Sequence, residues 1–325
     1  MKAFLSAFAV VFALVPAVVV HAQSYPSKPV RIMVGYSPGG GVDTTARIIA
    51  AALTELWGTQ VLVENRPGAA GNFATEFTAK AAPDGSTLVL CNIGSHAVTP
   101  ARFSKRLTYD PVGDFAFPVK IGGVPNVFMV HPSLPFNSLK QYIAYAKANP
   151  GKLNFGSSGV GASPHMSIEL LKTITGINIV HVPYKGAAPA LTDVISGHIE
   201  SSVGNLAGGP LGAIKAGRLR ALGVTSAKRN AQLPDVPTFQ EQGVEGYDVT
   251  GWYGLCTQAK VSQAIITKIN TDMGKLLASG SMLRKRLEDQ GIDVAPSTPD
   301  EFAAHVKSEI AKWTKVVKDA KLEAE

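Results

Sequence analysis

The stretch YSPGGGVDTTARIIA (Tyr36–Ala50) joins a predicted strand that ends at Gly35 to a predicted helix, through a run of three glycines. A helix that begins directly after such a turn presents about four unpaired backbone N–H groups and roughly half a positive charge. Glycine has no side chain, so an anion can approach these groups closely. The stretch therefore predicts an anion-binding turn. The alternative is a plain helix cap, with Asp43 as the capping residue.

The turn matches neither of the two common nucleotide-binding motifs. Counted from Gly39 and Gly41, the third required position of a dinucleotide fingerprint holds Thr44 in place of Gly or Ala, and no Gly-Lys-Ser/Thr of a phosphate-binding loop follows. We therefore expect no nucleotide and no other cofactor.

A second turn of the same kind occurs in NFGSSGVGASPHMSIELL (Asn154–Leu171), where Pro164 suits the first position of the next helix. Two further segments place small or polar residues after a strand: Asn92 to His96, and VPYKGAAPAL (Val182–Leu191). No Lys or Arg occurs within residues 36–46 or 153–171. Recognition of an anion at these turns would therefore rest on neutral donors.

Short apolar, β-branched runs alternate with helical patterns along the chain, which is typical of βαβ units around a largely parallel sheet. Strands are predicted at residues 30–35, 61–64, 87–91, 127–131, 153–155, 179–182, 199–203 and 219–224. Helices are predicted at residues 43–57, 138–149, 163–176, 262–279, 282–290 and 299–318. The chain is thus predicted to be an α/β protein.

The N-terminus has the pattern of an export signal. Met1-Lys2 is positively charged, residues 3–20 are almost wholly apolar, and Val20-His21-Ala22 offers small residues for cleavage. We expect residues 1–22 to be removed after export to the periplasm. A retained membrane anchor is the alternative, but Pro16 interrupts the run and no basic stop-transfer cluster follows. No Cys stands at the cleavage point, which argues against a lipid anchor.

Composition limits the remaining classes. A chain of 325 residues with 46% hydrophobic and 17% charged residues can form one large or two medium domains, and is neither a disulfide miniprotein nor disordered. The formal net charge is +7, but the basic residues are dispersed and the tightest cluster is Arg284-Lys285-Arg286. Without a basic stripe interleaved with aromatic residues, we expect no nucleic-acid partner.

The two cysteines, Cys91 and Cys256, both lie in apolar stretches. They form no CxxC motif, and no His is spaced from them as in a zinc site. Buried thiols and a single disulfide are both compatible with these positions, and the sequence favours buried thiols.

The enzyme alternatives are weak. Gly161-Ala162-Ser163-Pro164-His165 ends in His where a nucleophile elbow needs Gly. His96, His165 and His181 lack a carboxylate at ligand spacing, so we expect hydrogen-bonding loop histidines, no metal and no catalytic residue. Trp252 and Tyr253 could line a ligand site, but the pattern favours interdomain core.

Six motifs occur in order along the chain: YPSKPVRIMVGYSPGGGVD, VENRPGAAGN, AAPDGSTL, HVPYKG, LPDVPTFQEQG and GWYGL. Together they resemble the periplasmic solute receptors of tripartite tricarboxylate transporters, also called Bug (Bordetella uptake gene) receptors. The resemblance implies a two-lobed periplasmic binding protein of the type II class with hinge strands. Crossings near Gly122-Gly123 and Thr250-Gly251 would give lobe one as residues 24–122 and 251–325, and lobe two as residues 123–250.

The resemblance also implies a site that holds a ligand carboxylate through backbone amides and bridging waters. Carried over by matching position, its ligand-binding residues are Tyr36, Pro38, Gly39, Gly40, Asp43, Ser95, Ser157, Gly159, Gly161, Ala162, Ser163, Gly186, Ala187 and Asn205. One departure concerns residues 199–206, where family members commonly carry an Asp before Asn-Leu. This chain has small neutral residues there, which favours a plain carboxylate over an amino acid.

These features predict a monomeric receptor that closes on a small carboxylate and delivers it to the membrane permease of the transporter. Two alternatives stay open. One is a secreted enzyme that acts on a small carboxylate, and the other is a co-sensor that presents its ligand to a sensor kinase.

Overall fold

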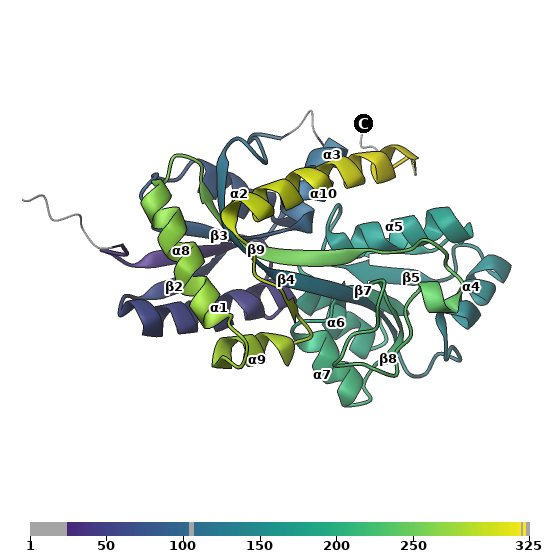
Figure 1. Ribbon diagram of the computed structural model, residues 1–325. Coiled ribbons are helices and arrows are strands. Elements are labelled where there is room, and N and C mark those ends of the chain that lie inside the picture. The colour runs from purple at the N-terminus through teal and green to yellow at the C-terminus, as the bar shows by residue number, and fades with distance from the viewer. Residues whose placement is uncertain (1–24, 104–106, 320, 323–325) are drawn as a thin grey trace, which may run out of the picture.

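The computed structural model describes residues 25–103, 107–319 and 321–322. The predicted export signal, residues 1–22, lies outside the described residues. Two α/β halves lie side by side and are connected by two strands, β4 and β9 (Figure 1). The strands are β1 (Val30–Val34), β2 (Val61–Asn65), β3 (Thr87–Asn92), β4 (Phe115–Val130), β5 (Asn154–Ser157), β6 (Val180–Pro183), β7 (Ser201–Asn205), β8 (Arg220–Val224), β9 (Thr250–Gln258) and β10 (Asp293–Val294).

Helices cover the sheet of both halves (Figure 1). The helices are α1 (Gly41–Trp57), α2 (Asn72–Ala79), α3 (Thr99–Phe103), α4 (Leu139–Ala148), α5 (Ser163–Thr175), α6 (Ala187–Ile195), α7 (Gly209–Lys215), α8 (Gln263–Leu276), α9 (Met282–Glu288) and α10 (Pro299–Asp319). Every helix that was predicted with 12 residues or more is present. An apolar face that repeats every 3.6 residues is a local signal, so such helices can be recognised from the sequence.

The sheet is mixed, which corrects the expectation of a largely parallel one. In the first half, β1 pairs in parallel with β2 and β3, and in the second half β5 pairs in parallel with β6 and β7. Between them, β4 pairs antiparallel with β9, and β9 pairs antiparallel with β3. Two sets of βαβ units are thus joined through antiparallel strands. No local sequence pattern predicts the pairing of these strands.

Strand β4 is much longer than the predicted strand at residues 127–131. Its residues from Phe115 to Pro125 pair with β9, whereas those from Asn126 to Val130 pair with β7 and β8 of the second half. One continuous strand therefore runs from one half into the other. The second connection is the start of β9, where Val249 still donates its N–H to the Thr225 carbonyl of the second half.

The hydrophobic core follows the alternation of the strands. In β1, Val30, Ile32 and Val34 face α1, α8 and α9, whereas Met33 faces the opposite side. That opposite side forms one continuous cluster with the second half, including Phe128 of β4. The halves are thus packed against a shared core beside the connecting strands.

Candidate functional site

A cavity lies between the two halves, at the ends of the strands that precede the glycine turns. About 400 Å³ of space lies between its lining atoms, counting the part open to solvent, but the centre of a water molecule can reach only about 20 Å³ of it, so the cavity is nearly closed in this conformation. The cavity is lined by Tyr36, Gly40, Gly41, Val42, Asn92, Ile93, Val124, Ser158, Ser163, Pro164, Ala187, Asn205, Gly251, Trp252 and Tyr253.

Three helices begin at this cavity. Gly41 is the first residue of α1, Ser163 of α5 and Ala187 of α6, and all three line it. None of the residues that line this cavity is a Lys or an Arg. Positive potential there comes from helix N-termini, whose unpaired N–H groups favour an anion. The arrangement can hold a negatively charged group without a salt bridge.

The first turn is shaped by Asp43, whose carboxylate is buried and points back into the turn. It accepts hydrogen bonds from the Gly39 N–H at 2.9 Å, Arg47 Nε at 2.9 Å and Asn65 Nδ2 at 2.8 Å. Burial alone would raise the pKa of Asp43, but these three donors outweigh it and lower the pKa. Asp43 therefore stays ionised and holds the shape of the glycine turn. It does not line the cavity.

In the second turn, several of the predicted amide donors already have partners. The Gly159 N–H donates to Ser157 Oγ, the Gly161 N–H to His165 Nδ1 and the Ala162 N–H to the Gly159 carbonyl, each at 3.2 Å. These groups form the turn itself. The donors left for a ligand are then those nearer the helix start, including Ser163.

Five of the predicted site residues line the cavity: Tyr36, Gly40, Ser163, Ala187 and Asn205. Gly159 lines a second hollow, which shares Tyr36 and Ser158 with the cavity and extends to Lys185. The other predicted residues lie outside both linings: Pro38, Gly39, Asp43, Ser95, Ser157, Gly161, Ala162 and Gly186.

Tyr36 and Ser95 show how the hydroxyl groups near the cavity are used. The Tyr36 hydroxyl donates to the Ala70 carbonyl at 2.8 Å, and burial raises its pKa, so it stays protonated. Ser95 Oγ pairs with His96 Nδ1 at 2.9 Å and does not reach the cavity. In the polar segment that ends β3, Asn92 lines the cavity instead.

Sequence reasoning missed ten lining residues. For Asn92 and Gly41 a signal was present, because both lie in segments singled out as donor-bearing turns. Trp252 and Tyr253 were assigned to the core, and they are 3% and 1% exposed, yet they also line the cavity. Val42, Ile93, Ser158 and Pro164 also lie in the segments singled out, but none was named as a ligand-binding residue. Val124 and Gly251 had no binding signal.

The two halves contact each other across the mouth of the cavity. The Lys185 carbonyl in the second half accepts hydrogen bonds from the Ser37 N–H at 3.2 Å and from Ser37 Oγ at 2.9 Å. Beside it, a Cβ placed on Gly40 would lie 3.5 Å from the Ala187 side chain, and one placed on Gly186 would lie 3.0 Å from Ser37. The first glycine turn and the segment from Lys185 to Ala187 therefore close over the cavity in this conformation.

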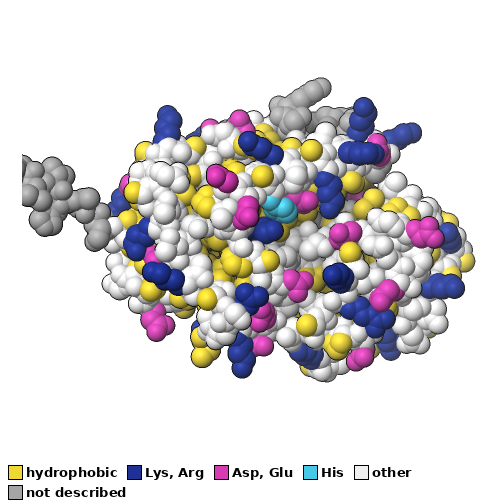
Figure 2. Space-filling model, in the orientation of Figure 1, with side chains coloured by type: hydrophobic (Ala, Val, Ile, Leu, Met, Phe, Trp, Pro, Cys, Tyr) yellow, Lys and Arg dark blue, Asp and Glu magenta, His cyan; other side chains and the backbone are white. Residues whose placement is uncertain are grey.

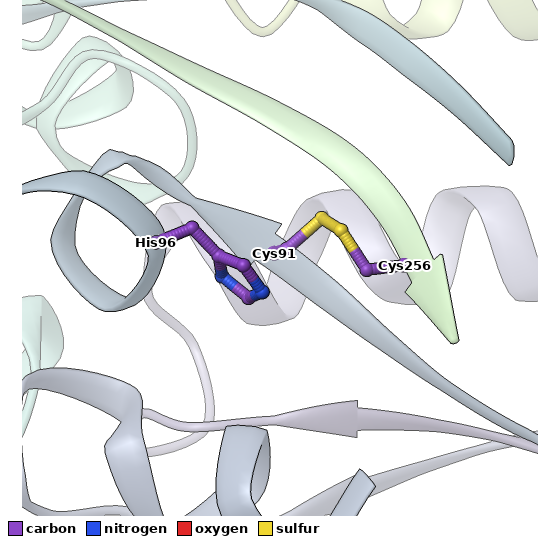
Figure 3. A group of neighbouring side chains, drawn as sticks. All are labelled: Cys91, His96 and Cys256. Carbon is purple, nitrogen blue, oxygen red and sulfur yellow. A yellow bond between two sulfur atoms is a disulfide. The ribbon is translucent and has the colours of Figure 1, made fainter. Parts of the chain in front are cut away.

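Cys91 and Cys256 form a disulfide, which corrects the preference for buried thiols (Figure 3). In the register of β3 and β9, Cys91 lies opposite Gly254 and Cys256 opposite Val89. The long-range pairing of these two strands brings the cysteines together, so the sequence could not separate the two alternatives. Both are fully buried.

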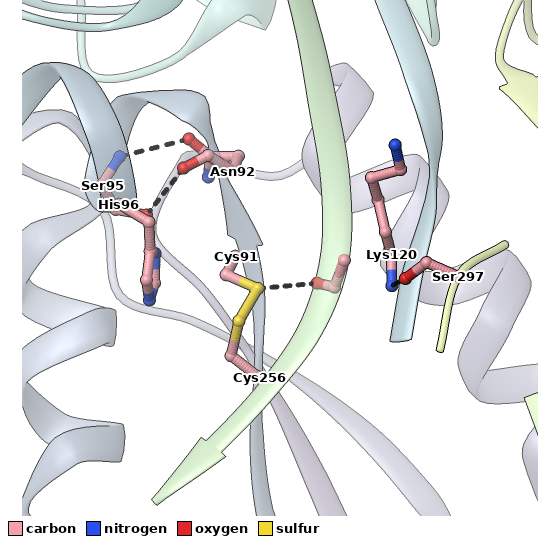
Figure 4. The surroundings of a disulfide bond; sticks show 8 residues. Cys91, Asn92, Ser95, His96, Lys120, Cys256 and Ser297 are labelled. Atoms are coloured by element: carbon pink, nitrogen blue, oxygen red, sulfur yellow. Dashed lines mark hydrogen bonds between the residues drawn. A yellow bond between two sulfur atoms is a disulfide. The ribbon is translucent and has the colours of Figure 1, made fainter. Parts of the chain in front are cut away.

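His96 lies within ligand distance of the two sulfur atoms, and the three residues would suit a metal ion if the cysteines were thiolates. The sulfur atoms are bonded to each other instead (Figures 3 and 4). Beside them, the Ser95 N–H and Oγ bond to Asn92 (Figure 4). Burial lowers the pKa of His96 to about 3, which keeps the ring neutral at physiological pH. The group is therefore a structural part of the first half.

His165 and His181 stack with ring centroids 4.0 Å apart, beneath the second turn. Burial is the largest cause that lowers the pKa of His165 to about 2 and of His181 to about 4. All three histidines make hydrogen bonds, as expected, but they lie in a helical turn, a helix and a strand instead of loops. His165 and His181 support the turn that carries Ser163.

Charged side chains of both signs are interspersed over the face shown in Figure 2. No basic stripe is visible there, in keeping with the dispersed Lys and Arg residues of the sequence. No helix within the described part of the chain combines the length and apolar character needed to cross a bilayer.

The fold, with a cavity between two α/β halves joined by crossing strands, is that of the type II periplasmic binding proteins. A model of the family described as "Tripartite tricarboxylate transporter family receptor" matches residues 45–322. The chain belongs to this family, as its motifs predicted. It is a solute-binding receptor and not an enzyme, and the family works with membrane components of a transporter.

Individual relatives agree with this assignment. Protein BugT of Bordetella pertussis is 32% identical over 92% of this chain and 91% of its own length. A structure from R. palustris solved with adipate is 36% identical, with a TM-score of 0.87, and covers 91% of this chain and 98% of that chain. MatC from Rhodopseudomonas palustris, solved with bound malate, is 30% identical with a TM-score of 0.83, and covers 90% of this chain and 100% of that chain.

Proposed function

We propose that this receptor captures a small dicarboxylate between two lobes in the periplasm, after export through a cleaved signal peptide, and delivers it to the permease of a tripartite tricarboxylate transporter. The observation that carries the proposal is the convergence of three helix N-termini on a cavity lined by no Lys or Arg. One carboxylate would bind there to backbone N–H groups and to polar side chains such as Ser163.

The dicarboxylate class is supported by the second hollow. It adjoins the cavity at Tyr36 and Ser158, so a ligand anchored at the helix starts can extend into it. Lys185 is the one Lys or Arg among the residues lining either space. Its positive charge suits a second carboxylate at the mouth. Adipate and malate, with which two relatives were solved, are ligands of this shape and charge.

Closure would involve the strands that connect the halves. We propose residues 24–122 and 251–325 as lobe one and residues 123–250 as lobe two, with hinges within β4 and at the start of β9. The hydrogen bonds from Ser37 to the Lys185 carbonyl join the proposed lobes on the cavity side. They would form only when the lobes close, so ligand binding and closure would be linked. The receptor would act as a monomer.

A pair of glycine variants tests the site. A Cβ at Gly41 would lie 2.7 Å from the Ala207 carbonyl oxygen and 3.1 Å from the Tyr253 hydroxyl, whereas one at Gly274 on α8 would meet no atom within 4 Å. We expect Gly41→Ala to weaken binding of adipate or malate at least tenfold, about 1.4 kcal/mol. Gly274→Ala, which lies outside the cavity lining, is the matched control and should stay within about threefold.

Isothermal titration of the wild-type protein with both acids comes first, with thermal unfolding of each variant to confirm the fold. Recovery of unchanged ligand after titration distinguishes a receptor from an enzyme. Equal affinities of the folded Gly41→Ala variant and the wild-type protein would show that this cavity is not the binding site. In a deletion strain, lost uptake of the ligand supports transport, whereas intact uptake with lost gene induction would indicate sensing.

A further inference from the structure

A chain of hydrogen bonds links the connecting strands to the cavity. The Tyr253 hydroxyl on β9 donates to Asn205 Oδ1 on β7 at 3.0 Å. Asn205 Nδ2 donates to Asn126 Oδ1 on β4 at 2.8 Å, and Asn126 Nδ2 donates to Ser163 Oγ at the start of α5 at 2.9 Å. Four side chains from four elements are thus joined in one direction, from Tyr253 to Ser163.

Asn126 lies between Asn205 and Ser163 in this series, and hydrogen bonds hold it in place. It is fully buried, so its amide must find partners inside the protein. Its backbone N–H donates to Thr225 Oγ1 at 3.0 Å, and its carbonyl accepts from the Thr225 N–H at 3.0 Å. Thr225 Oγ1 in turn donates to the Val249 carbonyl next to β9. These bonds fix the backbone of Asn126, and its amide cannot turn away from Ser163 without breaking the buried side-chain bonds to Ser163 and Asn205.

The direction of this chain decides what Ser163 offers to the cavity. Ser163 Oγ accepts from Asn126, so its own hydrogen is free to be donated elsewhere. Ser163 lines the cavity, whereas Asn126 does not. If these hydrogen bonds ran in the opposite direction, the Ser163 hydroxyl would donate its hydrogen to Asn126 and would present only lone pairs to the cavity. A carboxylate accepts hydrogen bonds and donates none, so only the observed direction suits it.

We propose that Asn126 is a positioning residue for carboxylate recognition: it holds the Ser163 hydroxyl as an acceptor, so that the hydroxyl hydrogen is donated to the bound anion. The inference rests on the proposed function, because it assigns the donor state of one group in that site. It also accounts for an uncharged asparagine in a fully buried position, since an aspartate there would reverse the Ser163 hydroxyl and add negative charge beside the ligand.

Three variants test the proposal by titration with adipate and malate. Ser163→Ala removes the donor, and we expect affinity to fall roughly ten- to a hundredfold, the usual range for a hydrogen bond to a charged group. Asn126→Asp keeps the shape of the side chain, but its carboxylate would accept the hydrogen of the Ser163 hydroxyl. We therefore expect affinity to fall at least as much as in Ser163→Ala. Asn126→Ala leaves the Ser163 hydroxyl free to turn toward the ligand and should weaken binding less than Asn126→Asp does.

Stability should follow the opposite order, which separates positioning from a structural role. Asn126→Ala creates a cavity and leaves buried groups without partners, so its thermal unfolding temperature should be lower than that of the isosteric Asn126→Asp. Asn137→Asp is the control, because it adds the same charge at an exposed position in the second half. We expect it to bind within about twofold of the wild-type protein.

Either of two results would overturn the proposal. One is wild-type affinity in Ser163→Ala or in Asn126→Asp. The other is that, of the two Asn126 variants, the one with the lower unfolding temperature also has the lower affinity. The wild-type protein is titrated first, so that the two failures are distinguishable. Binding of neither acid to it would instead refute the proposed ligand class and, with it, the premise of this inference.

Discussion

Removal of the Cys91–Cys256 disulfide should destabilise the protein strongly while leaving the binding site intact. The bond joins residues 165 positions apart. In the chain-entropy description, a cross-link over a loop of that length restricts the unfolded chain by about 5 kcal/mol. At roughly 2 cal/mol/K per residue over about 300 residues, this free energy corresponds to a melting temperature about 8 °C lower.

Ligand affinity should change little, by less than about threefold, because the strand ladder remains. Between β3 and β9, the pairs from Leu88–Thr257 to Asn92–Tyr253 hold the register without the sulfur atoms. Asn92 and Tyr253 line the cavity, and their positions depend on this ladder. The disulfide is therefore expected to act on the unfolded state and not on the site.

The assay is calorimetric unfolding of the oxidised wild-type protein and of a Cys91→Ala/Cys256→Ala variant. Alkylation in denaturant without reductant, followed by mass spectrometry, provides the control, since bonded cysteines should not react. Unfolding of the wild-type protein with and without reductant separates the cross-link from the loss of two buried sulfur atoms. A loss of stability below about 1 kcal/mol, or free thiols in the oxidised protein, would refute the reasoning.

Two further predictions concern pH and the first turn. Burial lowers the pKa of His96 to about 3 and is the main cause that lowers the pKa of His165 to about 2, so the unfolded chain takes up protons first as the pH falls. The free energy of unfolding should decrease between about pH 6.5 and pH 4, by about 1.4 kcal/mol per pH unit for each such histidine, and His96→Phe should flatten this slope in urea titrations. Carboxylates with a lowered pKa, such as Asp84, add to the loss of stability only as the pH falls below about 5. A stability that does not vary over this range would contradict the neutral buried histidines. Asp43→Ala leaves the Gly39 N–H, Arg47 and Asn65 without their acceptor, so stability should fall by about 1–3 kcal/mol together with ligand affinity, and Asp43→Asn should lose less. Unchanged unfolding and titration curves for Asp43→Ala would show that the turn keeps its shape without the carboxylate.

Much of the fold was predictable because its elements have local signals. The strand, glycine turn and helix around Tyr36 form as expected, and α5 begins at Ser163 with Pro164 in its first turn. The antiparallel pairing, the full length of β4 and the strand β9 were not predicted from the local pattern. β4 and β9 are paired by contacts between segments more than 100 residues apart in the chain, and neither has a regular alternation that marks its length.

The sequence indicated the turns beside the cavity better than it indicated which residues line the cavity. Gly40, Ser163 and Ala187 stand where three helices begin, and a glycine turn before an apolar helix is visible in any sequence. Which amides remain available was not visible. The Gly161 N–H donates to His165, which is only four residues further along the chain, but the geometry that allows this bond depends on the stacking of His165 on His181.

By itself, the sequence determined the alternation of elements, the donor-rich turns that lack Lys and Arg, and the family, because these depend on residues that are neighbours in the chain. The tertiary structure decided the disulfide, the mixed sheet, the lining of the cavity and the direction of the bonds through Asn126. Each of these depends on groups brought together from distant segments by packing, and the free energy of a buried hydrogen bond is set by the partner it meets there.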